Sequence, residues 1–166
     1  YGTTETAPGI TFTDHKKFVP GSCGMPVRHM DVKIAGSVSA DVPGEIVARG
    51  LNVMHGYYKN EEATRQVIDE EGWFHTGDLA TMSADGHIFI RGRIKNMLLG
   101  SNGQNVFPEE IENQLNSMAM VNESLVVQEG ERLVGLVYPD TDEMEALGLS
   151  VDDLEGVMEQ NRQELN

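Results

Sequence analysis

The segment Leu79-Ala80-Thr81-Met82-Ser83-Ala84-Asp85-Gly86-His87-Ile88-Phe89-Ile90-Arg91 decides how the first part of this chain folds. Two runs with many apolar residues, 79–82 and 87–91, lie on either side of Asp85-Gly86. That dipeptide readily supplies the positive φ angles that a tight turn requires. The segment therefore predicts a β-hairpin.

The residues before this hairpin also favour strands. Residues 1–58 contain many Gly and Pro together with short β-type runs, Val32–Ala35 and Glu45–Arg49, which predict a small sheet or distorted barrel. A short helix should follow, because Asn60 is a good N-cap and acidic residues occupy the expected first turn. This helix should end near Ile68, before a glycine.

After residue 92 the sequence changes character. Gly92–Gln104 is rich in Gly, Asn and Ser and predicts a connector with a small hairpin. Pro108–Met118 predicts a helix with proline at its first position and glutamates in its first turn. Ser124–Gln128 and Leu133–Tyr138 predict a second hairpin. A last helix should begin at Ser150, where a capping-box pattern precedes the apolar residues Val151, Leu154, Val157 and Met158.

These elements predict an α+β protein of two units. Residues 1–93 should form a small β-rich, barrel-like subdomain, and residues 94–166 a small α+β domain. Because the chain opens on Tyr1 within an apparent motif, we expect it to be a fragment of a larger enzyme and its second unit to be truncated.

Composition limits the classes of function. The 39% hydrophobic content suffices for a core, and no run of residues is long and apolar enough for a membrane span. No signal peptide is evident, so a cytoplasmic location is the default. The net charge of −15 argues against a nucleic-acid-binding surface. Most of this charge, −13, lies in residues 96–166. Three explanations of the uneven distribution stay open: an acidic face that binds a partner, an acidic helical surface exposed to water, or truncation of the sequence.

Three motifs resemble those of the adenylate-forming enzymes, which include acyl-CoA synthetases, firefly luciferase and the adenylation domains of peptide synthetases. They are Tyr1-Gly2-Thr3-Thr4-Glu5, Gly72-Trp73-Phe74-His75-Thr76-Gly77-Asp78, and Gly92-Arg93-Ile94-Lys95 continuing to Pro108-Glu109-Glu110-Ile111-Glu112. The resemblance covers nearly the whole chain. The run from Leu98 to Glu112 is more similar to bacterial long-chain fatty acid:CoA ligases than to peptide synthetases.

The resemblance implies a nucleotide site. Tyr1 would stack on adenine, and Thr4 would form a hydrogen bond with the α-phosphate of ATP or AMP. Glu5 would bind Mg²⁺, which prefers oxygen ligands. Asp78 would accept hydrogen bonds from the ribose hydroxyls, and Arg93 would also reach the ribose. Taken without the family, the first motif reads as loop, Asp78 as a turn or strand-end residue, and Arg93 as the partner of a nearby acid.

The resemblance also implies a moving small domain. Lys95 matches the hinge between the two domains of the family, although Asn96 departs from the Asp commonly found beside it. Gly100 and Gly103 resemble the loop that lines the tunnel for coenzyme A, where a close-approaching ligand leaves no room for a side chain. A plain flexible turn is the alternative for these two glycines.

The implied activity is that of an AMP-forming acid–thiol ligase, which joins a carboxylic acid, here a long-chain fatty acid, to coenzyme A through an acyl-adenylate. The sequence holds no glycine-rich phosphate loop ending in Lys, and no lysine follows Lys95. We therefore expect the chain to be inactive alone. Its expected partners are small molecules. A peripheral contact with a membrane stays an open alternative, through segments outside this sequence. The alternatives are a peptide-synthetase adenylation domain and a noncatalytic acidic interaction module.

Overall fold

The computed structural model describes residues 1–100, 103–130, 132–156 and 158–159. The chain divides into two compact units, Tyr1–Lys95 and Asn96–Asn166, and each is considered by itself. The assignment of these units as parts of a large and a small domain stays a prediction.

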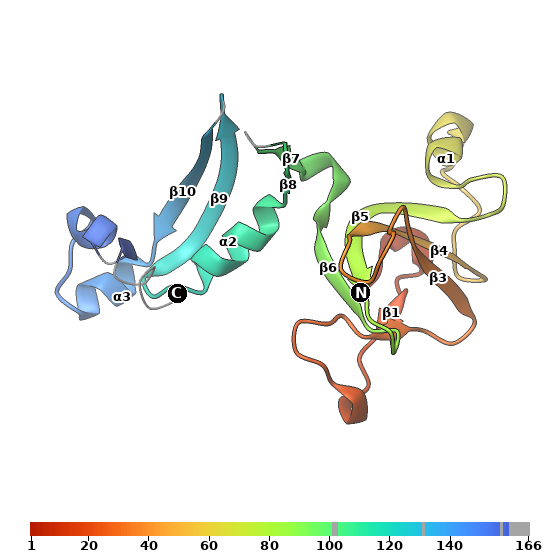
Figure 1. Ribbon diagram of the computed structural model, residues 1–166, viewed down its shortest axis with the longest axis horizontal. Coiled ribbons are helices and arrows are strands. Elements are labelled where there is room, and N and C mark those ends of the chain that lie inside the picture. The colour runs from red at the N-terminus through yellow and green to blue at the C-terminus, as the bar shows by residue number, and fades with distance from the viewer. Residues whose placement is uncertain (101–102, 131, 157, 160–166) are drawn as a thin grey trace. The chain divides into compact units, whose positions relative to one another are not determined.

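The first unit is built on an antiparallel sheet of four strands (Figure 1). Its order follows the sequence: β3 (Met30–Ala35), β4 (Gly44–Gly50), β5 (Phe74–Met82) and β6 (Ile88–Arg93). Smaller elements precede it, namely η1 (Thr4–Thr6), β1 (Thr11–Phe12), η2 (His15–Lys17) and β2 (Met25–Pro26). Among the described strands the sheet is open, with β3 and β6 at its edges, so the α+β class is confirmed with a sheet that does not close into a barrel.

The core of the first unit consists of two apolar clusters contributed by the sheet and the segment before it. Ile10, Met30 and Ala48 form one, and Ile46, Ala80 and Ile88 form the other. Tyr1 and Val32 pack against both clusters. The first residues of the chain therefore belong to the core, and burial of this apolar surface is the main force that holds them there.

The hairpin of β5 and β6 is confirmed, but its turn differs from the expected one. Of Asp85 and Gly86, only Gly86 has a positive φ, +90°. The Ser83 N–H donates to the oxygen of His87 at 2.9 Å, and the Gly86 N–H donates back to Ser83 at 2.9 Å. The loop is therefore longer than a two-residue turn, and Asp85 serves through its side chain instead of its backbone angle.

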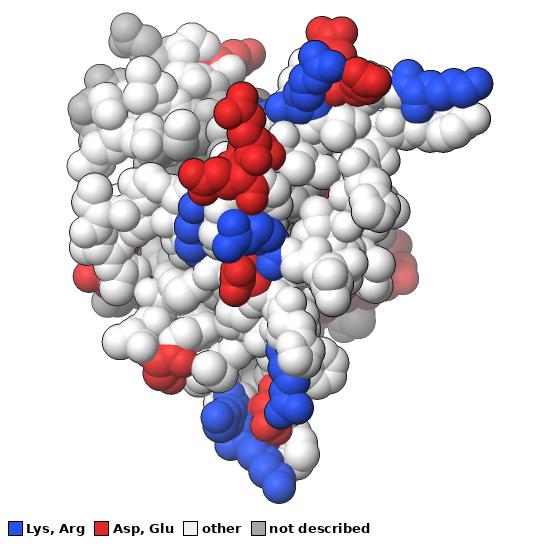
Figure 2. Space-filling view, turned by 90° about the vertical axis from the view of Figure 1, so that its right-hand side faces the viewer, with Lys and Arg blue, Asp and Glu red and all other residues white. Residues whose placement is uncertain are grey.

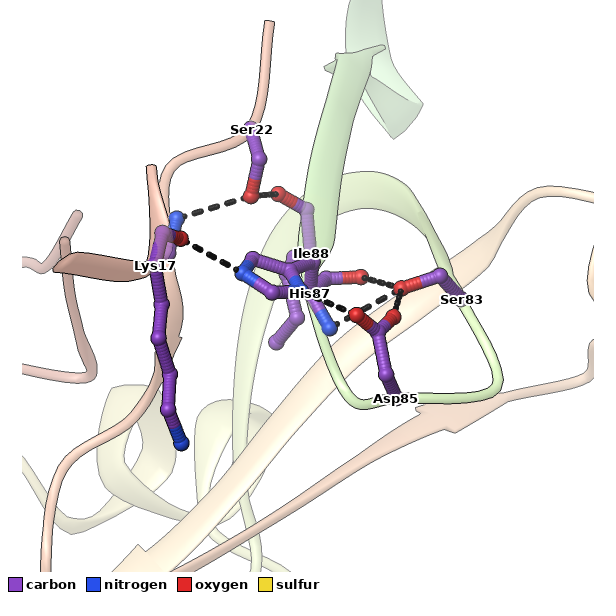
Figure 3. A network of polar contacts seen from close by, with 7 residues as sticks. Lys17, Ser22, Ser83, Asp85, His87 and Ile88 are labelled. Atoms are coloured by element: carbon purple, nitrogen blue, oxygen red, sulfur yellow. Dashed lines mark hydrogen bonds and ion pairs between the residues drawn. The ribbon is translucent and has the colours of Figure 1, made fainter. Parts of the chain in front are cut away.

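His87 fixes the segment before β2 to this hairpin (Figure 3). Its Nδ1 lies 2.9 Å from Asp85 Oδ2, and its Nε2 lies 3.0 Å from the backbone oxygen of Lys17. The Ser83 hydroxyl donates to Asp85 at 2.6 Å. The Ser22 hydroxyl donates to the Ile88 oxygen at 3.0 Å close by. Since His87 is only 5% exposed, its bonds are made away from bulk water.

Replacing His87 with alanine should lower the free energy of unfolding by about 1–3 kcal/mol, because the substitution removes a buried ring together with its hydrogen bonds to Asp85 and Lys17. Urea denaturation followed by tryptophan fluorescence measures this, and His15→Ala is the matched control because the His15 side chain is 86% exposed. Equal, small effects of the two substitutions would contradict the structural role of His87.

Helix α1 (Glu61–Val67) confirms the expected helix and its cap. The Asn60 side chain accepts a hydrogen bond from the Ala63 N–H at 3.0 Å, which satisfies one of the free donors at the helix start. The last turn ends at Ile68, whose N–H donates to Thr64 at 2.9 Å.

The second unit consists of a long hairpin with a helix along it (Figure 1). Its described elements are β7 (Leu98–Leu99), β8 (Asn105–Val106), α2 (Pro108–Asn116), β9 (Val121–Glu129), β10 (Arg132–Pro139), α3 (Thr141–Ala146) and η4 (Val151–Asp153), and η3 (Ile94–Asn96) spans the boundary. Both predicted hairpins and α2 are confirmed, although α2 ends two residues early. Glu112 ties α2 to β9 by accepting the Val126 N–H at 2.8 Å.

The last predicted helix is present in the described residues. Ser150 and Asp153 form the expected capping box, which opens a short 3-10 turn, and residues 154–156 and 158–159 continue as α-helix. Val157 of the predicted apolar face lies outside the described residues. Helix α3 was not predicted. Asp140 caps it by accepting the Glu143 N–H at 3.0 Å, and Met144, a residue of this helix, is buried.

Figure 2 shows the charged side chains on one face of the molecule. On the face drawn in Figure 2, Lys and Arg lie beside Asp or Glu, and neither sign forms one continuous patch. Arg65 pairs with Glu61 at 2.7 Å, and Arg49 pairs with Asp31 at 3.2 Å. Such exposed pairs contribute little to stability. Across the described residues, no helix has the length and apolar character needed to cross a bilayer.

Candidate functional site

Asp78 is the centre of the candidate site. It lies within β5, opposite Arg93 of β6, and it is 6% exposed. The Arg93 Nε lies 2.8 Å from Asp78 Oδ1, and the Tyr1 hydroxyl donates to Asp78 Oδ2 at 2.5 Å. The structure thus brings Tyr1 together with Asp78, although the two are 77 positions apart in sequence.

A buried aspartate requires partners, because an unpaired charge is costly to bury. Arg93 supplies the opposite charge, and its side chain remains 57% exposed. An ionised carboxylate offers about four lone-pair sites, of which Tyr1 and Arg93 take one on each oxygen. Within the described part of the chain no other side chain bonds this carboxylate, so one acceptor site remains on each oxygen of Asp78. Asp78 lies in the middle of β5, so it is neither a turn residue nor a strand-end residue. The alternative role considered for Arg93, an ion pair with a nearby acid, is present.

Tyr1 is held by both its ring and its hydroxyl. The ring packs against the two core clusters, and the hydroxyl donates to Asp78. Burial, and then the hydrogen bond to Asp78, raise the pKa of the Tyr1 hydroxyl well above its usual value. Tyr1 is therefore a neutral donor at any ordinary pH, and its ring orientation is fixed relative to the carboxylate.

Glu5 lies in η1, beside the exposed Thr4. The Tyr57 hydroxyl donates to Glu5 Oε1 at 2.9 Å, and the Met54 N–H donates to the backbone oxygen of Glu5 at 2.7 Å. The backbone N–H of Glu5 itself, and next the Tyr57 hydroxyl, hold the pKa of Glu5 below its usual value, and Arg93 acts in the same direction. Glu5 is thus kept ionised near the Asp78 cluster.

The donor set of Glu5 fits Mg²⁺ in one particular way. Among the described residues no group of three or more His, Cys, Asp or Glu side chains is arranged to hold a metal ion. Mg²⁺ commonly takes only one or two carboxylates and completes its shell with substrate phosphates and water. Glu5 offers one carboxylate, which the Tyr57 hydroxyl orients by donating to Oε1, and a single carboxylate suits that arrangement.

The remaining predicted site residues are Lys95, Gly100 and Gly103. Lys95 is an exposed residue of η3 at the last position of the first unit. Gly100 and Gly103 belong to the second unit, where the Gly103 N–H donates to Gly100 at 2.8 Å and Gly103 has a φ of +77°. A Cβ on Gly103 would meet no atom within 4 Å. The hinge and tunnel roles of these residues stay predictions.

Sequence reasoning missed several polar residues that support the site. Tyr57 bonds Glu5, which is 52 positions away, and His75 contacts Glu45, which is 30 positions away, so no local pattern reveals either contact. Glu45 carries no sign of its role in the sequence, since its contacts are with residues 30 or more positions away. Thr76 likewise bonds across the sheet to Ile46 at 2.8 Å.

Comparison with known proteins agrees with the geometry. Residues 1–58 match the family described as AMP-binding enzyme. The chain is 45% identical over 121 residues to a feruloyl-CoA synthase of Amycolatopsis sp, covering 69% of this chain and 24% of that protein. It is 42% identical over 132 residues to a long-chain-fatty-acid–CoA ligase of Yersinia pestis, covering 76% of this chain and 23% of the ligase.

A solved structure shows the same fold. O-succinylbenzoate coenzyme A synthetase from Bacillus subtilis, in complex with ATP and magnesium ion, superposes with a TM-score of 0.72 at 32% identity, over 84% of this chain and 30% of that one. The chain spans about a quarter of the length of the curated relatives it matches. The motifs, the fold and these relatives agree, and the chain belongs to the adenylate-forming, AMP-binding enzyme family of acyl-CoA synthetase type.

Proposed function

We propose that the chain is part of an ATP-dependent, AMP-forming ligase that joins a carboxylic acid to coenzyme A. The observation that carries this proposal is the buried Asp78 carboxylate, oriented by Tyr1 and Arg93 and left with one acceptor site on each oxygen. Two neighbouring acceptor sites suit the two adjacent hydroxyls of a ribose.

The other residues of the first unit take roles around that contact. Tyr1 stacks its fixed ring on adenine, Arg93 helps to hold the ribose, and Thr4 donates to the α-phosphate. Glu5 binds Mg²⁺, and the ion, when bound, neutralises charge that develops on the phosphates. Positioning and electrostatic stabilisation of this kind are the main contributions that a protein makes to transfer at phosphorus.

The second half-reaction, transfer of the acyl group from the adenylate to coenzyme A, requires a different orientation of the small domain. We place the hinge at Lys95, and Gly100 and Gly103 beside the thiol arm of coenzyme A after the small domain has turned. Closure of this type allows one nucleotide site to serve both adenylation and thioester formation. Support comes from the motif positions and from the exposed place of Lys95 at the end of the first unit.

For the acid we propose a long-chain fatty acid, on the resemblance of residues 98–112 and on the similarity to the Yersinia ligase. The feruloyl-CoA synthase relative makes an aromatic acid the competing substrate. A cytoplasmic location and small-molecule partners belong to the same proposal.

The intact protein should form acyl-CoA and AMP from ATP, Mg²⁺, coenzyme A and palmitate, whereas residues 1–166 alone should form none. The phosphate loop and terminal lysine expected of the family are missing from these residues, so the loss should be complete within detection. Thioester formation is followed by absorbance and mass spectrometry, with boiled protein as the control.

Ferulate assayed in parallel decides between the two acids. Faster turnover of ferulate would overturn the fatty-acid assignment and keep the ligase. If the intact protein forms no AMP with any acid, the proposed ligase activity is contradicted. If residues 1–166 form thioester above the boiled control, the expected inactivity of this part is contradicted.

A further inference from the structure

Strand β5 carries an irregularity immediately before Asp78. Gly44 pairs with Ala80 and Glu45 with Leu79, but the next pair of β4 and β5 is Val47 with His75. Three β5 residues, 76–78, therefore face Ile46 alone. A bulge of this kind bends its strand and changes the direction of nearby side chains. Asp78 is the last residue of the irregular segment, so its direction depends on the conformation of that segment.

The Glu45 carboxylate holds the bulge with both of its oxygens. Oε1 accepts the Gly77 N–H at 3.0 Å, and Oε2 lies 2.7 Å from His75 Nδ1. The Glu45 side chain is only 20% exposed. Bulged residues lose their partners in the ladder, and an unpaired backbone N–H away from water is costly. Glu45 thus replaces the hydrogen bond that regular pairing would have given to Gly77.

Other contacts show that the bulge is a defined conformation. Gly77 has a φ of +73°, which residues with a Cβ rarely adopt. The Thr76 hydroxyl donates to Ile46 at 2.8 Å and accepts the Asp78 N–H at 3.1 Å. On its far side, His75 Nε2 lies 3.6 Å from Asp69 Oδ2.

The far end of the bulge meets the candidate site directly. From Asp78 onward β5 pairs with β6, so that Asp78 lies opposite Arg93. A carboxylate that must accept two ribose hydroxyls needs its direction fixed, because misplacement of a binding group by about 1 Å can cost about a hundredfold in rate. Tyr1 and Arg93 hold the carboxylate itself, while the backbone beneath it is held by the bulge.

We propose that Glu45 is a positioning residue for nucleotide binding: by clamping His75 and Gly77 it holds the bulge that directs the Asp78 carboxylate toward the ribose hydroxyls. The inference rests on the proposed function, and it assigns to Glu45 an effect on nucleotide affinity that acts only through Asp78.

Substitutions of Glu45 in the intact protein separate positioning from stability. Glu45→Ala should weaken AMP binding about tenfold, since the Asp78 hydrogen bonds to the ribose are partly lost. Glu45→Gln should stay within about threefold, because the amide still accepts from Gly77 and can donate to His75. Asp31→Ala is the matched control, since Asp31 is a carboxylate of the same sheet paired with Arg49. Calorimetry gives the affinity for AMP, and the KM for the carboxylic acid should be unchanged in all three variants.

A double-mutant cycle with Asp78→Ala tests the route of the effect. Glu45→Ala should change AMP affinity less than twofold once Asp78 is already alanine. An equal loss in both backgrounds, or an affinity within twofold of the unmodified protein in folded Glu45→Ala, would overturn the inference. If Glu45→Ala does not fold, Glu45→Asp decides: its shorter side chain cannot reach both partners, and unchanged AMP binding would then overturn it.

The same measurements separate a failure of the positioning role of Glu45 from a failure of the proposed function. If the unmodified protein binds no AMP, the proposed function fails and the positioning role fails with it. If AMP binds and Asp78→Ala weakens binding while the Glu45 variants do not affect it, only the positioning role fails.

Discussion

Lys95→Pro in the intact ligase is expected to block transfer of the acyl group to coenzyme A while adenylate formation continues. Lys95 is the last residue of the first compact unit, and it is exposed within η3. Proline fixes φ near −65° and restricts the preceding residue as well. A hinge works by changing one or two backbone angles, so this substitution should hold the second unit in one orientation.

The two half-reactions can be measured apart for this variant. Pyrophosphate exchange reports adenylation, and thioester yield from preformed acyl-adenylate reports transfer. Lys95→Ala is the control, because it removes the exposed amine and leaves the backbone free. Equal losses in both steps, or full activity of the proline variant, would show that the pivot lies elsewhere.

Asp78→Ala should weaken the binding of ATP and AMP by about 1.5–3 kcal/mol, the usual contribution of hydrogen bonds to a charged group. That is a loss of about tenfold to a hundredfold or more in affinity. The fold should survive, because Arg93 is exposed enough to turn to water and the remaining strand pairs stay in place.

Isothermal calorimetry with AMP checks this second expectation, and Asp41→Ala in the exposed loop between β3 and β4 is the control. Unchanged affinity in a folded Asp78→Ala protein would return Asp78 to a purely structural role, with Arg93 as its ion-pair partner.

Local signals in the sequence were sufficient for most elements. The N-cap at Asn60, the proline at the start of α2 and the alternating runs on either side of residues 83–87 all act within a few positions. Helix α3 carried a similar signal, since Asp140 precedes Glu143 by three residues, but its six residues are too short to show periodicity.

The support of the candidate site was not predictable in the same way. The contact of Tyr1 with Asp78 joins residues 77 positions apart, and the clamp of Glu45 on Gly77 depends on the register of two strands. Register follows from which faces are buried and from the turns between strands, and no motif in β4 reveals a bulge in β5. Motifs therefore located the residues that touch the nucleotide in our proposal, whereas geometry was needed to find those that orient them.

Tyr1 joins the candidate site to the core, and under the proposed function this makes ligand binding and folding one coupled equilibrium. A nucleotide present at a hundredfold excess over its dissociation constant stabilises its host by about 2.7 kcal/mol. In the reverse direction, a substitution of Val32, which packs against the same two clusters as Tyr1, would alter affinity without touching a nucleotide atom. The melting temperature of this unit would then serve as a gauge of how much nucleotide it carries.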